Sequence, residues 1–144
     1  MESYREMRAR QQAEVNALPL GYAYGDKQFA EMMSKWGLEP TDTDKIYKLG
    51  VPGCFYQRKD SDVIKATFDR HTKEFNDAIE SDITGEDFIY QMFVDELFDH
   101  EYSYTYDSDD AIYACGFTPE EVFASEKLSN ALNKACNYVM SCDI

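Results

Sequence analysis

Residues 61–81 read SDVIKATFDRHTKEFNDAIES, and the spacing of their apolar side chains indicates a largely helical protein. Ser61 can cap the start of a helix, and apolar or aromatic side chains then recur every three or four residues. This stripe consists of Ile64, Phe68, His71, Phe75 and Ala78. The pattern predicts a long helix that buries one face and ends at about Ser81.

The same period recurs on both sides of this stretch and predicts further helices. Caps, glycines and prolines mark their ends, including a capping box at Thr118-Pro119-Glu120-Glu121. The predicted helices run from Glu2 to Asn16, from a cap at Asp26 to Gly37, from Thr84 or Gly85 to about His100, from Asp109 to Cys115, from Pro119 onward, and from a cap at Ser125 nearly to the chain end.

Two stretches have a strand-like pattern. Between Lys45 and Arg58, the turn at residues 50–53 separates two short apolar runs and predicts a small hairpin. In residues 102–106, tyrosines alternate with polar residues, which predicts a short strand with three tyrosines on one face, able to pair with the hairpin. We expect an α+β, mainly helical fold, with about five to six helices around a small antiparallel hairpin or three-stranded sheet.

The composition is that of one folded domain, residues 1–144, since 44% of the residues are hydrophobic and 15% are aromatic. The N-terminus has no apolar run typical of a signal peptide, and no stretch is long and apolar enough to span a membrane. The four cysteines are irregularly spaced, which favours reduced thiols. We therefore expect a cytoplasmic protein.

The formal net charge of −14 is confined to one part of the sequence. The block from Glu74 to Glu126 contains 16 acidic residues and neither Lys nor Arg, whereas the flanking segments are almost neutral. Like charges one helical turn apart, such as Asp95 and Asp99, destabilise a helix, so folding alone does not call for such a block.

An acidic surface of this kind suits a partner with a basic surface, and grooves that bind nucleic acid are strongly basic. Regularly spaced carboxylates can imitate a row of phosphates, whereas nucleic acid itself would be repelled. Tyrosines exposed among the acids would suit a protein interface. The residues we expect to contact the partner are Asp95, Asp99, Glu101, Asp107, Asp109, Asp110, Glu120 and Glu121. Alternatively, the charge serves only to keep the protein soluble.

The sequence has two histidines, and helical projection places both among apolar residues. His71 with Glu74, and His100 with Glu96, could together form a site of two histidines and two carboxylates, which are ligands typical of zinc or iron. The alternative is that both histidines are hydrogen-bonded core residues. A third possibility, zinc bound by Cys115, Cys136 and Cys142, has no motif spacing behind it.

No catalytic motif is present in the sequence. The cysteines have no electropositive neighbours that would favour a thiolate, and Gly50-x-x-Gly53 lacks the lysine and the length of a phosphate-binding loop. These observations favour a non-enzymatic binding protein. A small metal-binding protein is the second possibility.

Several short strings are distinctive together. They are Asn16-Ala17-Leu18-Pro19, Thr43-Asp44-Lys45-Ile46-Tyr47 with Gly50 and Gly53, Phe88-Ile89-Tyr90-x-Met92-Phe93, Glu96-Leu97-x-x-His100-Glu101-Tyr102, and Ala114-x-Gly116-Phe117-Thr118. Over nearly the whole chain, the sequence resembles a family of small acidic proteins of gut bacteria, their phages and mobile elements. The resemblance implies no established activity and assigns no site residue. Small acidic proteins of phages include anti-CRISPR and anti-restriction inhibitors that act as DNA mimics, so by analogy the resemblance suggests a CRISPR effector nuclease in the cytoplasm of a bacterial host cell as the partner. The resemblance also leaves a third possibility, an accessory protein of a mobile element without an inhibitory role.

Overall fold

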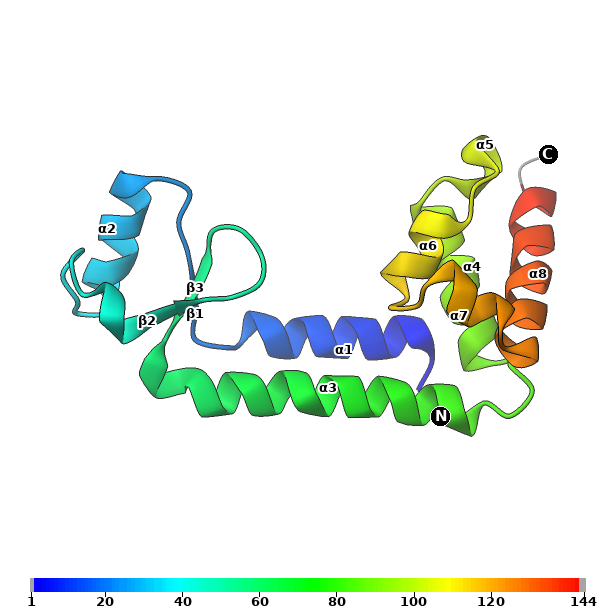
Figure 1. Cartoon of the computed structure of the whole chain (residues 1–144), viewed down its shortest axis with the longest axis horizontal. Coiled ribbons are helices and arrows are strands. Elements are labelled where there is room, and N and C mark those ends of the chain that lie inside the picture. The colour runs from blue at the N-terminus through cyan, green and yellow to red at the C-terminus, as the bar shows by residue number, and fades with distance from the viewer. Residues whose placement is uncertain (1, 143–144) are drawn as a thin grey trace. The chain divides into compact units, whose positions relative to one another are not determined.

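The structure, a computed structural model, describes residues 2–142. The chain divides into two compact units. Residues 11–72 form one, which we call the sheet unit. The described residues 2–10 and 73–142 form the other, which we call the helical unit. The long helices α1 (Tyr4–Asn16) and α3 (Ser61–Ser81) are shared between the units, since each has one part in the sheet unit and one in the helical unit (Figure 1).

The sheet unit contains three short strands, β1 (Leu20–Tyr22), β2 (Ile46–Lys48) and β3 (Cys54–Gln57). They pair antiparallel in the order β1-β3-β2, so β2 and β3 form the predicted hairpin. Strand β1 was not predicted, because Gly21 leaves it only two side chains with which to show a period. The short 3-10 helices η1 (Thr43–Lys45) and η2 (Arg58–Asp60) precede β2 and follow β3.

Helix α2 (Asp26–Lys35) covers one face of this sheet. Its apolar stripe was predicted to be buried, and Met32 and Met33 are buried. The left-handed Gly37, with φ of +73°, follows the helix, and the Leu38 N–H closes its last turn on the carbonyl of Met33 at 2.8 Å. The core of the unit consists of Ala23, Met32 and Met33, against which pack Phe29, Trp36, Leu38, Ile46 and Phe55.

The helical unit is organised around α4 (Phe88–Asp99), which packs along α8 (Glu126–Ser141) (Figure 1). The shorter helices α5 (Tyr102–Thr105), α6 (Asp109–Ala114) and α7 (Pro119–Phe123) connect them. The capping box at the start of α7 is confirmed, since Thr118 and Glu121 exchange hydrogen bonds of 2.9 and 3.1 Å. The Ser125 cap of α8 is confirmed as well.

Apolar residues of α1, α4, α6, α7 and α8 form most of one buried core. Tyr4 and Met7 of α1 belong to it, and Phe75, Ala78 and Ile79 of α3 pack against it. The remaining buried members are Phe88, Ile89, Met92, Phe93, Leu97, Ala111, Ile112, Cys115, Val122, Leu128, Ala131, Leu132, Ala135 and Val139. The unit is therefore held together by the packing of short helices on α4 and α8.

Helix α4 begins at Phe88, later than the predicted start at Thr84 or Gly85. The buried carboxylate of Asp82 explains the difference. It accepts hydrogen bonds from the backbone N–H groups of Gly85, Asp87 and Ile89, at 3.1, 3.2 and 2.9 Å. These bonds hold the preceding residues in a turn, with Gly85 at φ of +78°.

The predicted tyrosine strand over residues 102–106 is wrong, because Tyr102–Thr105 form helix α5. Its hydrogen bonds are local, with the N–H groups of Tyr104 and Thr105 donating to Glu101 and that of Tyr106 to Tyr102. All strands of the sheet lie within residues 20–57, so this segment pairs with none of them. The alternation of tyrosines is compatible with one short helical turn because four residues are too few to distinguish the two periods.

The predicted fold class is confirmed. Residues 2–142 contain eight α-helices and one three-stranded antiparallel sheet, so the protein is a mainly helical α+β protein. None of the helices within these residues combines the length and the apolar character needed to cross a membrane.

Candidate functional site

Part of the acidic block is neutralised by arginines of α1. Arg5 pairs with Asp95 at 2.9 Å. Arg8 donates to Glu96 and lies 3.5 Å from Asp99. Asp95 and Asp99, which we expected to contact a partner, therefore already have cationic neighbours within the helical unit.

Other carboxylates of the block are paired at its margins. Arg10 contacts Glu74 with two nitrogens, at 3.1 and 3.3 Å. Lys73 binds Asp77 and Lys134 binds Glu86, each at 2.7 Å. The excess charge of the helical unit is consequently concentrated on the carboxylates that these cations do not reach.

Six of the eight predicted contact residues belong to this group. Within residues 2–142, no lysine or arginine nitrogen lies within 4 Å of their carboxylates, and all six are exposed. They are Glu101, Asp107, Asp109, Asp110, Glu120 and Glu121. The first four lie between the end of α4 and the first turn of α6, and the last two lie in the first turn of α7.

Two of these six have local structural roles. Asp107 accepts the N–H of Asp109 at 2.9 Å, which shapes the turn before α6. Glu121 accepts the N–H of Thr118 in the capping box. The other four carboxylates make no hydrogen bond within residues 2–142. They belong to Glu101, Asp109, Asp110 and Glu120.

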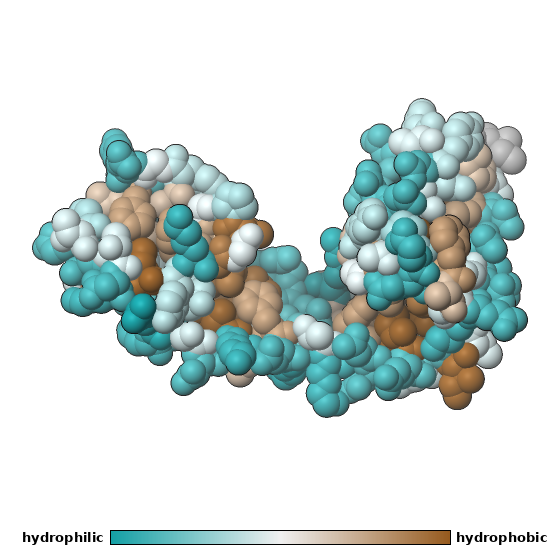
Figure 2. Space-filling model, viewed as in Figure 1, coloured by the Kyte–Doolittle hydropathy of each residue, from teal (hydrophilic) through white to brown (hydrophobic). Residues whose placement is uncertain are grey.

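Exposed tyrosines accompany these acids. Tyr104, Tyr106 and Tyr113 are 76%, 71% and 57% exposed. Tyr113 lies on the same face of α6 as Asp109 and Asp110, four and three residues earlier. We call residues 101–113 the acidic tyrosine segment; in Figure 2, the visible face of the helical unit is mostly hydrophilic.

The backbone of the acidic tyrosine segment is held in an uncommon conformation. Glu101 and Tyr106, on either side of α5, have φ of 53° and 56° in the left-handed region. Such a conformation is unfavourable for residues other than glycine and persists only where the surroundings enforce it. Tyr102, which is half-buried against the core, holds α5 in place, while Tyr104 and Tyr106 remain exposed.

Of the predicted metal ligands, Glu96 and His100 lie together. The buried carboxylate of Glu96 accepts a hydrogen bond from Tyr4 Oη at 2.8 Å and another from Arg8. His100 Nδ1 lies 2.8 Å from the backbone oxygen of Glu96 and 3.6 Å from its Oε2. Glu96 thus connects α1 to α4 and stands beside one histidine.

His71 and Glu74 are three residues apart on α3, on either side of the boundary between the two units, and Glu74 binds Arg10. His71 is buried, and its Nε2 makes no hydrogen bond among the described residues but lies 3.6 Å from Glu14 Oε2. Glu14 also binds Arg70. Each histidine therefore has a carboxylate neighbour in its own unit, and Glu14 was not among the predicted ligands.

The cysteines are free thiols. Cys54 and Cys115 are buried, and burial raises the pKa of Cys115 to about 12. Burial also raises the pKa of Cys136, although a hydrogen bond with Tyr102 partly opposes the shift. These environments disfavour a thiolate.

The prediction missed the arginines that pair with the block. Arg5 and Arg8 lie three residues apart, on the N-terminal part of α1, opposite Asp95 and Asp99, which lie four residues apart on α4. The matching spacing of opposite charges on two helices was the only available signal, and it does not show which helices pack together.

A model of a family of unknown function, DUF7659, matches residues 3–138. The chain belongs to the DUF7659 family. The match covers the acidic tyrosine segment and residues of both units, from the start of α1 into α8. Searches of curated proteins and of solved structures each gave no match.

Proposed function

We propose that this DUF7659 protein is a non-enzymatic binding protein whose acidic tyrosine segment occludes a basic, nucleic-acid-binding surface of another protein, such as a CRISPR effector nuclease. The main support is the concentration of exposed, unneutralised carboxylates beside exposed tyrosines in residues 101–113. Such a partner would be met in the cytoplasm of a bacterial host cell.

The charge distribution supports an electrostatic attraction of this kind. Arg5 and Arg8 of α1 neutralise Asp95 and Asp99 of α4. The electric field of the acidic block is therefore strongest near Glu101, Asp109 and Asp110. A local field of one sign accelerates encounter with a surface of the opposite sign and weakens with added salt. Nucleic acid, which is itself negative, would be repelled from the same segment.

The tyrosines supply what carboxylates lack. A tyrosine has a large apolar ring and a polar hydroxyl, and few rotatable bonds, so it gains contact area at a small entropic cost. The enforced conformation of α5 presents Tyr104 and Tyr106 before any partner binds, which further lowers that cost. Electrostatics would bring the partner close, and the tyrosines would then contribute short-range contacts.

A salt titration of binding to a purified CRISPR effector nuclease tests the proposal. We expect binding at low salt, competition with labelled target DNA, and a Kd that rises with salt concentration. The variant Glu101→Gln/Asp109→Asn/Asp110→Asn should weaken binding at least tenfold, by loss of three charges. Absence of binding at low salt would refute the proposal for that effector class.

A matched control removes three other charges from the same block. Asp77→Asn/Glu80→Gln/Glu126→Gln changes net charge equally but lies outside the acidic tyrosine segment. It should weaken binding much less. Equal weakening by both variants would show that net charge alone matters and that the segment is no interface.

A further inference from the structure

A second surface lies in the sheet unit, at the outer edge of β1. This strand has one neighbour, β3, and its Gly21 pairs with Phe55. Ala23 N–H donates to the Gly53 carbonyl at 2.9 Å, so Gly21 and Ala23 direct their backbone groups toward β3. Alternate residues of an antiparallel strand direct theirs to the opposite side. The N–H and carbonyl of Tyr22 therefore point away from the sheet.

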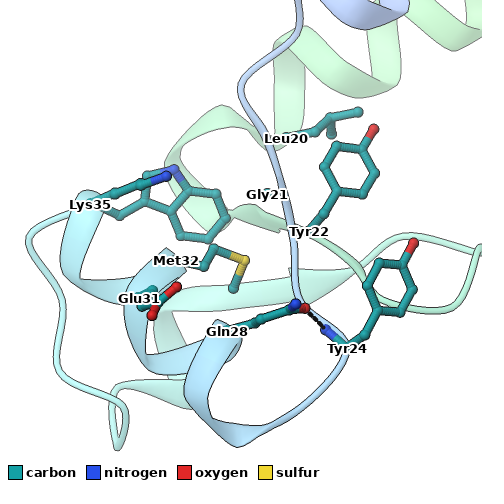
Figure 3. A pocket seen from close by; sticks show the side chains of 9 residues that line it. Leu20, Gly21, Tyr22, Tyr24, Gln28, Glu31, Met32 and Lys35 are labelled. Atoms are coloured by element: carbon teal, nitrogen blue, oxygen red, sulfur yellow. Dashed lines mark hydrogen bonds between the residues drawn. The ribbon is translucent and has the colours of Figure 1, made fainter.

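The edge of β1 lies in a groove with a volume of about 540 Å³. Figure 3 shows the strand running between two sets of side chains, with Met32 and Gln28 of α2 on one side and the rings of Tyr22 and Tyr24 on the other. Trp36 continues the α2 side of the groove. The outward backbone groups of β1 are thus flanked by apolar and aromatic surface.

Gly21 brings the wall of the groove close to the strand. A Cβ atom at this position would lie 2.6 Å from Met32 Sδ and 2.7 Å from the Trp36 ring, closer than atoms can approach. The absence of a side chain lets α2 pack directly against the backbone of β1. An added strand would therefore contact both the edge of β1 and the side chains of α2.

The two edges of the sheet differ in how well they are protected against the pairing of a further strand. Lysines on edge strands oppose the pairing of further strands, and β2 carries Lys48, with Lys45 just before it. Strand β1 consists of Leu20, Gly21 and Tyr22 and has neither a charge nor a proline. It is the unprotected edge.

Two charges in the groove relate the direction of an added strand to the order of its charged residues. Tyr24 N–H donates to the Gln28 side chain at 2.8 Å, whereas Trp36 lies beside Gly21, so α2 runs opposite to β1 along the groove. Lys35 therefore lies toward the start of β1 and Glu31 toward its end. No ion pair of either side chain is found among residues 2–142.

The spacing of these charges matches an extended peptide. Glu31 and Lys35 are one helical turn apart, about 5 to 6 Å, and alternate residues of a strand are about 7 Å apart. A strand antiparallel to β1 would place a basic side chain opposite Glu31 and, two residues later, an acidic side chain opposite Lys35. The residue between them would face Tyr22 and Tyr24.

A short segment fits this surface better than a second copy of the chain. Strand β1 has three residues, which gives a ladder only about 10 Å long. Stable dimers bury about 1,200 Å² or more in total, whereas a groove of 540 Å³ has the size of a typical ligand site.

We propose that the groove between β1 and α2 docks an extended segment of another protein, with the order basic, apolar, acidic, as a fourth strand antiparallel to β1. Backbone hydrogen bonds to Tyr22 would supply affinity, and Glu31 and Lys35 would set direction and preference. This site is independent of the acidic tyrosine segment.

The test uses the full chain and two blocked synthetic peptides, Ser-Thr-Lys-Val-Glu-Val-Thr-Ser and its charge-swapped form Ser-Thr-Glu-Val-Lys-Val-Thr-Ser. The single tryptophan of the sequence, Trp36, lines the groove, so its fluorescence reports binding. We expect the first peptide to bind at least tenfold more tightly and to shift the amide resonances of residues 20–24. If neither peptide binds, the proposal is overturned.

Two variants locate the binding. The double variant Glu31→Lys/Lys35→Glu should reverse the preference between the peptides, and an unchanged preference would overturn the proposed orientation. Tyr22→Pro removes the outward N–H without removing a bond to β3 and should weaken binding at least tenfold. Lys48→Pro makes the same change at the other edge and should leave binding unchanged.

Analytical ultracentrifugation tests whether a second copy of the chain, and not a peptide segment, occupies the edge of β1. If the protein without peptide forms a dimer that Tyr22→Pro abolishes, the edge is occupied by a second copy and the proposal is overturned. If Tyr22→Pro fails to fold, as circular dichroism would show, the reversal of charge preference still decides the matter, because Glu31 and Lys35 are exposed on α2.

Discussion

The hydroxyl of Tyr4 donates a 2.8 Å hydrogen bond to the buried carboxylate of Glu96, 92 residues later in the sequence. Because the acceptor is a buried carboxylate, this bond should contribute about 1.5 to 3 kcal/mol. Tyr4→Phe is therefore expected to lower the free energy of unfolding by that amount in urea. The control Tyr104→Phe removes a hydroxyl from an exposed ring and should change stability by less than about 0.5 kcal/mol.

A double-mutant cycle with Glu96→Gln measures the coupling between the two residues. The destabilising effects of mutating two side chains in direct contact differ from their sum by about 0.5 to 3 kcal/mol. Strictly additive effects of Tyr4→Phe and Glu96→Gln would contradict the importance of this bond for the docking of α1 on α4.

Asp82 organises the turn before α4 through three backbone N–H groups. Asp82→Ala would leave these donors without their acceptor, and we expect a loss of at least about 2 kcal/mol in the free energy of unfolding. Asp87→Ala is the matched control, since the exposed carboxylate of Asp87 accepts, among residues 2–142, only from the Gln91 side chain. Similar losses for both variants would argue against the role of Asp82.

Gly21 is required by the close approach of α2 to β1. Gly21→Ala should destabilise the protein by about 1 to 3 kcal/mol, because the new Cβ would displace Met32 and Trp36. Gly50→Ala, where a Cβ would meet nothing within 4 Å, should be nearly neutral. Thermal unfolding of the two variants makes the comparison, and a neutral Gly21→Ala would show that α2 can move away from the strand.

The four cysteines should differ in their reaction with iodoacetamide at pH 8. Cys142 is exposed and should be modified first, whereas Cys54 and Cys115 are buried and should be protected in the folded protein. Burial also raises the pKa of Cys115 to about 12, which leaves very little thiolate. Mass spectrometry of peptides would identify the modified sites; modification of Cys115 as fast as Cys142 would contradict its burial.

The raised pKa of Cys115 also predicts how stability depends on pH. The unfolded thiol loses its proton near pH 9, while the folded protein keeps it until about pH 12. The contribution is fully present below pH 9 and is lost as the pH rises through this window, because the unfolded state then binds fewer protons. Urea titrations from pH 8 to 11 should show this decline, and Cys115→Ala should reduce its slope.

The long helices were predictable because each has a sustained stripe and a recognisable end. Residues 61–81 form the predicted helix, and Thr118 begins α7 with the predicted capping box. Short elements carry too few residues for a period to be reliable, so β1 was missed and α5 was predicted as a strand. In both cases, tertiary contacts determine the local structure.

The candidate surface was predictable only in part. The acidic block is visible in the sequence, but its neutralisation by Arg5 and Arg8 depends on which helices pack together. For the same reason, the carboxylate that lies beside His71 in the sheet unit is Glu14, which is 57 positions away in the sequence and was not predicted. Long-range pairing of helices is information that a single sequence does not display.

The way the chain enters and leaves the helical unit has a consequence for dissecting it. Residues 11–72 form an insertion within that unit's sequence, and Tyr4 and Met7 lie in the core built by residues after 72. A protease that cuts the exposed turn at Val51 would produce two fragments, yet the N-terminal fragment would stay bound through Tyr4 and Met7. Nicked protein would therefore elute as one particle in size-exclusion chromatography until it is denatured. Two fragments that are divided at this turn and expressed separately should likewise associate.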